Sequence, residues 1–216
     1  MTTAGLDEAG RGPVIGPMVV AGVLIKGSKL KFLKEIGVKD SKLLSRDMRE
    51  KLRGVIEEIA DSYVVKVVQP RRIDEAVSRN MLNQLEAEVM AEIIRELRPT
   101  LAIVDSPLVN TRKFSSMIKS MTTGIRYRLI ARNKADRKYV HVAAASIIAK
   151  VERDRIIDEI KEELGVDFGS GYPSDPKTKK FIEELIKGRK RPSFVRWNWN
   201  TVRKHMIRPE SLEGYL

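Results

Sequence analysis

The order of its apolar segments constrains the fold of this chain more than any other feature. Two strand-like segments come first, at 3–8 and 17–25, and a loop rich in glycine and proline separates them. Later strand-like segments, at 63–68, 100–105 and 125–131, alternate with segments whose apolar residues recur at helical spacing. Strands joined by a short loop pair antiparallel, whereas strands separated by a helix pair in parallel. The sequence therefore predicts an α/β layer fold with antiparallel first strands and parallel later ones.

The helical segments carry their own start and stop signals. Ser45 and Asn110 are good N-caps, Pro70 and Pro176 suit first helical positions, and Gly165 suits a helix C-terminus. We expect helices over 45–61, 70–78, 82–97, 110–121, 138–164 and 176–188. The glycine-containing loop after the longest helix predicts a division into residues 1–165 and a small helical extension, residues 166–216.

Charge indicates the kind of partner. The 216 residues include 41 Lys and Arg against 29 Asp and Glu, a net charge of +12, and such a field attracts polyanions. The stretch 185–209 contains no acidic residue and eight basic ones: Lys187, Arg189, Lys190, Arg191, Arg196, Arg203, Lys204 and Arg208. Its Trp197 and Trp199 either stack on a duplex or belong to the core of a small subdomain. Nucleic acid is the first partner to consider, although abundant Lys, Arg and Glu are also typical of heat-adapted proteins.

Other classes of protein are excluded by what the sequence lacks. There is no cysteine, which excludes thiol catalysis and thiolate metal sites. The N-terminus shows no signal pattern and no apolar run is long enough to cross a membrane, so we expect a cytoplasmic protein without membrane contacts, acting as a monomer. His141 and His205 are the only histidines, and neither is assigned a role.

Acidic residues stand where predicted strands end or helices begin, which is where open α/β sheets bind ligands: Asp7, Glu8, Asp105 and Asp136. Carboxylates from separate elements suit Mg²⁺, a hard cation that prefers oxygen ligands. Each also has a plainer interpretation, since a strand-end Asp can close a turn and Asp136 can cap the following helix. Adjacent residues of a regular strand point to opposite faces, so Asp7 and Glu8 can share one site only if the strand is distorted or Glu8 contributes through its backbone.

Six motifs occur in the order found in the ribonuclease HII family, and the chain closely resembles the archaeal branch of that family. They are DEAGRG (7–12), KDSKLLS (39–45), VDSP (104–107), KAD (134–136), AAASIIAKVERD (143–154) and FGSGYPSDP (168–176). The resemblance implies a ribonuclease H-like fold, with a mixed five-stranded sheet flanked by helices. Residues 1–165 would then form the catalytic domain and residues 166–216 a helical extension that binds substrate.

The resemblance also implies an activity. The four acidic residues would hold two divalent ions, Mg²⁺ or Mn²⁺, which activate the attacking water and stabilise the leaving 3′-oxygen. The substrates would be RNA/DNA hybrids and DNA duplexes containing ribonucleotides, cut by phosphodiester hydrolysis to leave a 3′-hydroxyl and a 5′-phosphate.

Substrate-binding positions are implied in the same way. A tight turn after the first strand would read the 2′-hydroxyl through its backbone: Gly10, Arg11 and Gly12. Tyr172 would pack on the sugar at an RNA-to-DNA junction, although the residues alone also allow an aromatic docked on the core. Phosphate contacts are implied for three further residues, for which capping and surface charge are the alternative: Lys42, Ser146 and Lys150.

Two other functions stay open at this point. Another ribonuclease H-like nuclease, such as a junction resolvase, could use the same carboxylates, although the turn at 10–12 and Tyr172 argue against it. A non-catalytic nucleic-acid-binding protein would need only the basic charge, and the four carboxylates would weaken its binding. The chain ends in EGYL (213–216), without a glutamine-led motif, so no replication-clamp peptide is expected.

Overall fold

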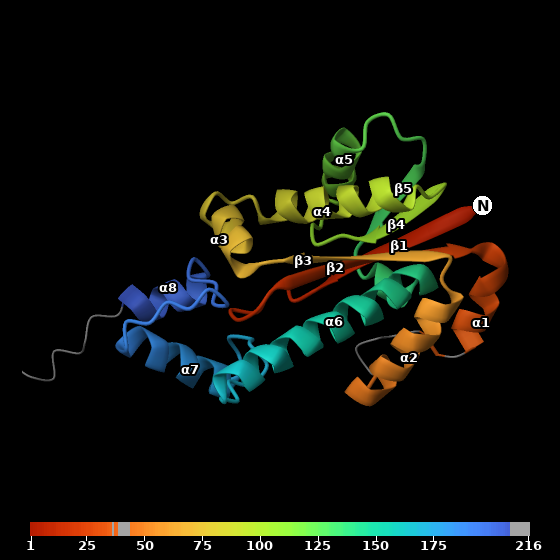
Figure 1. The fold of residues 1–216 in the computed structure, drawn as a ribbon. Helices are drawn as coiled ribbons and strands as arrows, with labels where there is room; N and C mark the ends of the chain where they lie inside the picture. The colour runs from red at the N-terminus through yellow and green to blue at the C-terminus, as the bar shows by residue number, and fades with distance from the viewer. Residues whose placement is uncertain (36, 39–43, 208–216) are drawn as a thin grey trace, which may run out of the picture.

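The computed structural model describes residues 1–35, 37–38 and 44–207, and shows one sheet between two layers of helices (Figure 1). The strands are β1 (Thr2–Ala9), β2 (Met18–Lys26), β3 (Ser62–Val68), β4 (Leu101–Asp105) and β5 (Arg128–Arg132). Their order is β3-β2-β1-β4-β5, with β1–β2 and β2–β3 antiparallel and β1–β4 and β4–β5 parallel. The predicted α/β fold, with its mixed five-stranded sheet, is therefore confirmed. The strand at 62–68 departs from the expected parallel pairing of later strands, because β3 pairs antiparallel with β2 although helices separate them in the chain.

The predicted helices are present, together with short helices that the spacing of apolar residues did not indicate. They are η1 (Gly27–Lys29), α1 (Leu30–Glu35), α2 (Arg46–Ile59), α3 (Pro70–Ser78), α4 (Leu82–Leu97), α5 (Thr111–Met121), η2 (Ala135–Arg137), α6 (Val140–Leu164), α7 (Pro176–Lys187) and α8 (Asn200–Ile207). Ser45 caps α2 by accepting a hydrogen bond from the amide of Met48 (3.2 Å), and Asn110 caps α5 through the amide of Lys113 (3.1 Å). Both predicted caps are confirmed.

The start of β5 differs from the prediction. The apolar segment begins at Ile125, but the strand begins at Arg128. The amide of Ile125 donates to the carbonyl of Thr122 (3.3 Å), and the Lys119 ammonium donates to the carbonyl of Tyr127 (2.8 Å). Residues 125–127 therefore complete the turn after α5 instead of pairing with β4.

The sheet separates two apolar cores. On one face Ala4 and Leu6 of β1 pack in a core with residues of α4 and α5, and on the other face α6 crosses the sheet beside α2 (Figure 1). Gly5 faces α6, and a Cβ there would lie 2.1 Å from the backbone carbon of His141. Helix and strand backbones are therefore in direct contact, which only glycine allows at this position.

A third core joins the C-terminal segment to the loop after β1. Phe168, Ile182 and Val195 pack there with Ile15 of the loop and Ile157 of α6. Ile15 and Val195 also form an isolated antiparallel bridge. Trp197 and Trp199 are partly buried against this core, which agrees with their interpretation as packing residues. In the described ranges, no helix combines the length and apolar character that crossing a membrane requires.

Candidate active site

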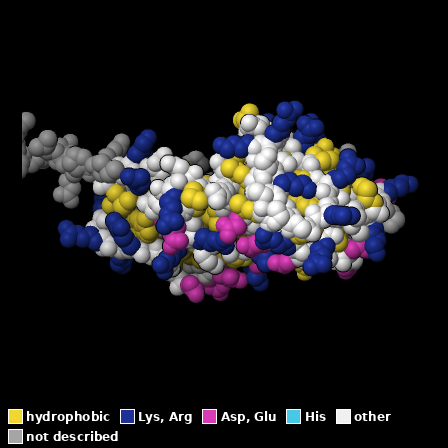
Figure 2. Space-filling model, turned by 90° about the horizontal axis from the view of Figure 1, so that it is seen from above, with side chains coloured by type: hydrophobic (Ala, Val, Ile, Leu, Met, Phe, Trp, Pro, Cys, Tyr) yellow, Lys and Arg dark blue, Asp and Glu magenta, His cyan; other side chains and the backbone are white. Residues whose placement is uncertain are grey.

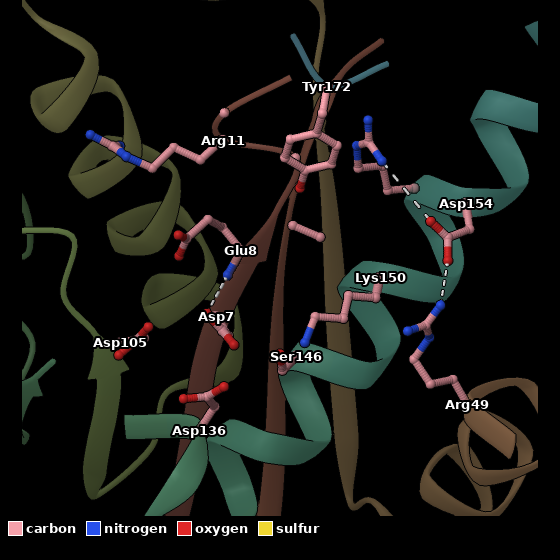
Figure 3. A pocket seen from close by; sticks show the side chains of 14 residues that line it. Asp7, Glu8, Arg11, Arg49, Asp105, Asp136, Ser146, Lys150, Asp154 and Tyr172 are labelled. Carbon is pink, nitrogen blue, oxygen red and sulfur yellow. Dashed lines mark hydrogen bonds and ion pairs between the residues drawn. The ribbon is translucent and has the colours of Figure 1, made fainter. Parts of the chain in front are cut away.

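A cavity of about 350 Å³ lies at the carboxyl ends of β1 and β4, which are neighbours in the sheet (Figure 3). It is lined by Asp7, Glu8, Ala9, Gly10, Arg11, Gly12, Arg49, Asp105, Asp136, Ser146, Lys150, Arg153, Asp154 and Tyr172. These residues include every site residue expected from the sequence except Lys42, which lies outside the described residues. The topology therefore brings together segments that are more than 160 positions apart in the chain.

Asp7 and Glu8 point to opposite faces of the sheet. β1 keeps its pairing with β2 as far as Ala9, so the distortion considered from the sequence is absent from this strand. The Asp7 carboxylate faces α6 and is hydrogen-bonded by the side chain of Ser146. Glu8 points the other way, toward Arg11 (Figure 3). Both side chains still line one cavity because they stand at the edge where the sheet ends.

The contact between Ser146 and Asp7 follows from the packing of α6 on β1. Gly5 lies against His141, and Asp7 is two residues further along the strand, roughly 7 Å at a rise of 3.3–3.4 Å per residue. Ser146 is five residues further along the helix, roughly 7.5 Å at 1.5 Å per residue. The two side chains therefore arrive at the same level at the mouth of the cavity.

Asp105 and Asp136 are positioned by one turn. The Asp105 carboxylate accepts a hydrogen bond from the amide of Ala135 (2.7 Å), at the start of η2, and η2 carries Asp136. This hydrogen bond joins two segments 30 positions apart, so it is a tertiary contact and not the local turn of the plainer interpretation, and Asp105 also lines the cavity. Asp136 does not cap α6, because the N-cap of that helix is Tyr139 and its side chain makes no capping hydrogen bond.

Burial makes the carboxylates of this site hard to ionise. Desolvation, followed by the charges of Glu8 and Asp105, raises the pKa of Asp7 well above its ordinary value. Desolvation, followed by the charges of Glu86 and Asp105, raises the pKa of Glu8 to about 8. The pKa of Glu86, wholly buried on α4, is raised to about 7 by desolvation, although its ion pair with Arg11 opposes the rise. Such a site favours a cation that replaces the protons.

The donor set suits a hard divalent cation. The Oε2 atom of Glu8 is buried and accepts no hydrogen bond from the described residues, and carboxylate oxygens are the ligands that Mg²⁺ and Mn²⁺ prefer. As they stand, no three acidic or imidazole side chains within the described ranges are grouped closely enough to hold an ion. This agrees with the opposite directions of Asp7 and Glu8. The residues therefore fit such ions by their chemistry and burial, and not as a preassembled cluster.

The turn at 10–12 borders the cavity opposite the carboxylates. Gly10 has a φ of +82°, and a Cβ there would lie 2.5 Å from the Cδ of Arg153. A Cβ on Gly12 would meet only the ring of Tyr172, at 3.7 Å. Tyr172 is 41% exposed, with the Arg153 guanidinium 5.4 Å from its ring centroid, so it is not the core aromatic that the residues alone allowed. Gly12 and the flat ring of Tyr172 lie side by side at the rim.

Sequence reasoning missed four residues at or beside this site. Arg49 of α2 pairs with Asp154 of α6 (2.9 Å), and Arg153 packs on Gly10. The motif at 143–154 contained the signal for the two α6 residues, because positions 146, 150, 153 and 154 share one face of a helix. Glu86 forms an ion pair with Arg11. The sequence contained a signal for it as well, because Glu86 is a charged residue within the apolar stripe of its helix.

The basic stretch at 185–209 is divided by the structure. Arg196 is wholly buried, so it cannot supply surface charge as expected. Arg189, Lys190, Arg191 and Arg203 are exposed, whereas Arg208 lies outside the described residues. The stretch is therefore part surface and part core.

Comparisons with known proteins place the chain in a family. A family model described as Ribonuclease HII matches residues 4–202. Ribonuclease HII of Pyrococcus horikoshii is 47% identical over 94% of this chain and 92% of its own length, and that of Archaeoglobus fulgidus is 46% identical over 98% and 99%.

Solved structures agree with the sequence matches. The ribonuclease H2 of P. horikoshii OT3 has a TM-score of 0.88 at 46% identity, covering 95% of this chain and 97% of that one. The A. fulgidus RNase HII, solved in complex with PCNA, has a TM-score of 0.85 at 44% identity, covering 100% of both chains. That complex leaves the expectation of no clamp peptide unsupported, and residues 213–216 lie outside the described residues. The fold, the family model and relatives matched along nearly their whole length all agree. The chain therefore belongs to the ribonuclease HII family.

Proposed function

We propose that this protein is an endonuclease that hydrolyses the RNA strand of RNA/DNA hybrids and cleaves at ribonucleotides embedded in duplex DNA. The products are a 3′-hydroxyl and a 5′-phosphate. One observation carries this proposal: the carboxylates of β1, β4 and η2 line the same cavity as the turn at 10–12 and Tyr172. Membership of the ribonuclease HII family supports it. Lys and Arg side chains, which suit a polyanionic substrate, are spread over the face seen in Figure 2.

Four residues would hold the divalent cations of the reaction, Mg²⁺ or Mn²⁺: Asp7, Glu8, Asp105 and Asp136. When bound, such ions lower the pKa of the attacking water and stabilise charge on the leaving 3′-oxygen. The chain contributes carboxylates whose ionisation is disfavoured by burial, so cation binding displaces protons from Asp7 and Glu8. The hydrogen bonds from Ser146 to Asp7 and from Ala135 to Asp105 hold two of these carboxylates in place.

The rim of the cavity would recognise the ribonucleotide. Gly12 is exposed and has no side chain, so the turn can approach a sugar closely and hydrogen-bond its 2′-hydroxyl. Tyr172, beside it, can pack on a deoxyribose but meets the extra hydroxyl of a ribose, which favours an RNA-to-DNA junction. Ser146 and Lys150 line the cavity where they can contact phosphates, and Lys42 is proposed for the same role from the family motif alone.

The C-terminal segment would extend the binding surface. We assign catalysis to residues 1–165 and added substrate affinity to residues 166–216. The exposed basic residues at 187, 189–191, 203 and 204 support this division. Phosphate contacts through Lys and Arg add affinity without chemistry.

The test is incubation with Mg²⁺ and three labelled substrates: a DNA duplex with one ribonucleotide, the same duplex without it, and a four-way DNA junction. We expect cleavage of the first alone, at the ribonucleotide, with a 3′-hydroxyl and a 5′-phosphate at the nick. Asp105→Asn, which keeps the shape of the side chain, is the matched control and should not cleave. Cleavage of the junction alone would support a resolvase, and binding without any cleavage would support a non-catalytic protein.

A further inference from the structure

Arg196 is the largest wholly buried side chain among the described residues, and it lies directly behind the turn at 10–12. Its guanidinium donates to three backbone carbonyls of the loop after β1. Nη2 donates to the carbonyl of Gly10 (2.6 Å), Nη1 to that of Arg11 (3.0 Å), and Nε and Nη2 to that of Gly16 (3.0 and 2.9 Å). One side chain from the C-terminal segment thus holds both ends of this loop.

The backbone around Arg196 is fastened to the same loop. Its amide donates to the carbonyl of Val14 (2.8 Å), and the amide of Gly16 donates to the carbonyl of Phe194 (2.8 Å). The Arg196 guanidinium lies 5.3 Å from the ring of Trp199, on the same segment. Its position is therefore set by several independent contacts.

The carbonyl directions decide the amide directions. In a planar trans peptide the C=O and N–H bonds point in opposite directions. The carbonyls of Gly10 and Arg11 point at Arg196, so the N–H groups of Arg11 and Gly12 point away from it. Neither N–H donates a hydrogen bond to any described residue, and both residues line the cavity. Two donors are thus left for a ligand at the rim.

Stability alone is a poor explanation for Arg196. No carboxylate forms a salt bridge with it in the described part of the chain, and burial, followed by the nearby charge of Arg153, lowers its pKa to about 9. Burying a charge without an ion pair is costly, and an apolar side chain of similar size fills a core at lower cost. What an apolar side chain cannot do is orient three carbonyls at once, which the planar fork of arginine can.

We propose that Arg196 is a positioning residue for ribonucleotide recognition, which orients the peptide groups at 10–12 so that the amides of Arg11 and Gly12 face the 2′-hydroxyl. This rests on the proposed function of the turn. It follows that the C-terminal segment contributes to specificity through a buried contact, in addition to any affinity from its exposed charges.

The test measures discrimination in the full chain, in an Asp136→Asn background that prevents cleavage. Dissociation constants are measured for a duplex with one ribonucleotide and for the same duplex made of DNA. Arg196→Met should lower the preference for the ribonucleotide about 3- to 10-fold, the value of a hydrogen bond of roughly 1 kcal/mol, with all-DNA affinity within about twofold of the parent. Arg196→Lys keeps the charge but lacks the planar fork, and should give an intermediate preference.

Arg203→Met is the matched control, because it removes an exposed arginine from the same segment. It should weaken binding of both duplexes equally and keep the preference. The inference would be overturned if Arg196→Met keeps the parent's circular dichroism spectrum and also keeps its preference for the ribonucleotide duplex. If Arg196→Met does not fold, Arg196→Lys decides by the same ratio. Failure of the proposed function would be seen separately. The Asp136→Asn parent would then bind both duplexes equally, and the wild-type protein would not cleave.

Discussion

Alanine substitutions at the two glycines of the turn should have opposite effects on stability and activity. Gly10 has a φ of +82°, whereas Gly12 has no positive φ and its Cβ would meet only the Tyr172 ring at 3.7 Å. The family resemblance implied that the turn reads the sugar through its backbone, so a side chain at either position would obstruct the substrate. The structure separates them, because the space beside Gly10 is filled by Arg153 and the carbonyl of Pro17, which a Cβ would approach to 2.5 and 2.7 Å.

The magnitudes follow from this geometry. Gly10→Ala places a side chain in the left-handed region, which costs roughly 1–2 kcal/mol, and overpacking adds roughly 1–3 kcal/mol. At roughly 2–4 °C per kcal/mol for a chain of this length, we expect a fall in the melting temperature of about 4–20 °C. Gly12→Ala fits the folded chain and restricts the unfolded one, so its free energy of unfolding should change by less than about 1 kcal/mol. Its methyl group would stand where we propose that the sugar approaches, and kcat/KM should then fall about 10- to 100-fold.

Thermal and urea unfolding measure the effect on stability, and cleavage of a duplex with one ribonucleotide, followed over a range of concentrations, measures kcat/KM. Gly12→Ala should unfold with the parent and cleave poorly. Wild-type kcat/KM in Gly12→Ala would refute close backbone approach at this residue. An unchanged unfolding midpoint in Gly10→Ala would refute the packing argument for Arg153.

Four further predictions concern catalysis, affinity, specificity and pH. Asp105→Asn should keep duplex binding while cleavage falls by about three decades, roughly 4 kcal/mol, and near wild-type turnover at saturating Mg²⁺ would remove it from the catalytic set. Neutralising the three basic residues at 189–191 should flatten the plot of log K against log salt. The slope should change by up to about one unit for each phosphate that these residues contact in the wild-type complex, and an unchanged slope would show that they do not touch the substrate. Tyr172→Ala should lower kcat/KM more on a single ribonucleotide in DNA than on a long hybrid, and an unchanged ratio would contradict its junction role. Burial, with a smaller contribution from the charge of Lys34, lowers the pKa of His141 to about 4. As the pH falls, the imidazole is therefore protonated first in the unfolded chain, and the free energy of unfolding decreases between about pH 6.5 and pH 4. In urea titrations over that pH range, the free energy of unfolding of His141→Gln should fall by up to roughly 3 kcal/mol less than that of the wild type. An equal fall in both proteins would assign the effect to carboxylates.

Local signals in the sequence were sufficient for most of the fold. Ser45 and Asn110 each satisfy amides within three residues, so their role as caps is visible in a short window. The elements that were missed, such as α1 and α8, have six and eight residues, too few for a clear apolar period. The start of β5 was misplaced because the apolar segment from Ile125 runs on through a turn. Tertiary contacts decide such cases.

The directions of Asp7 and Glu8 show what strand geometry alone could determine. Alternation along a regular strand predicts opposite faces, and the structure keeps that alternation. The sequence placed both residues at the end of a strand, but it did not show that side chains from both faces of the sheet border one cavity there. That fact depends on β4 stopping beside β1 at Asp105, which is a property of the assembled sheet.

Arg196 shows why the site could not be completed from local patterns. The stretch 185–209 that contains it is basic and lacks acids, so the pattern indicated a solvent-exposed charge. Its hydrogen-bond partners lie 180 to 186 positions away, and no periodicity connects them. The useful signal was instead at the N-terminal loop. A loop covered by other segments must have its carbonyls paired, and Gly10, Arg11 and Gly16 offer three that no strand or helix of their own could satisfy. A side chain with several donors in one plane meets that need, which favours an arginine over a lysine at position 196.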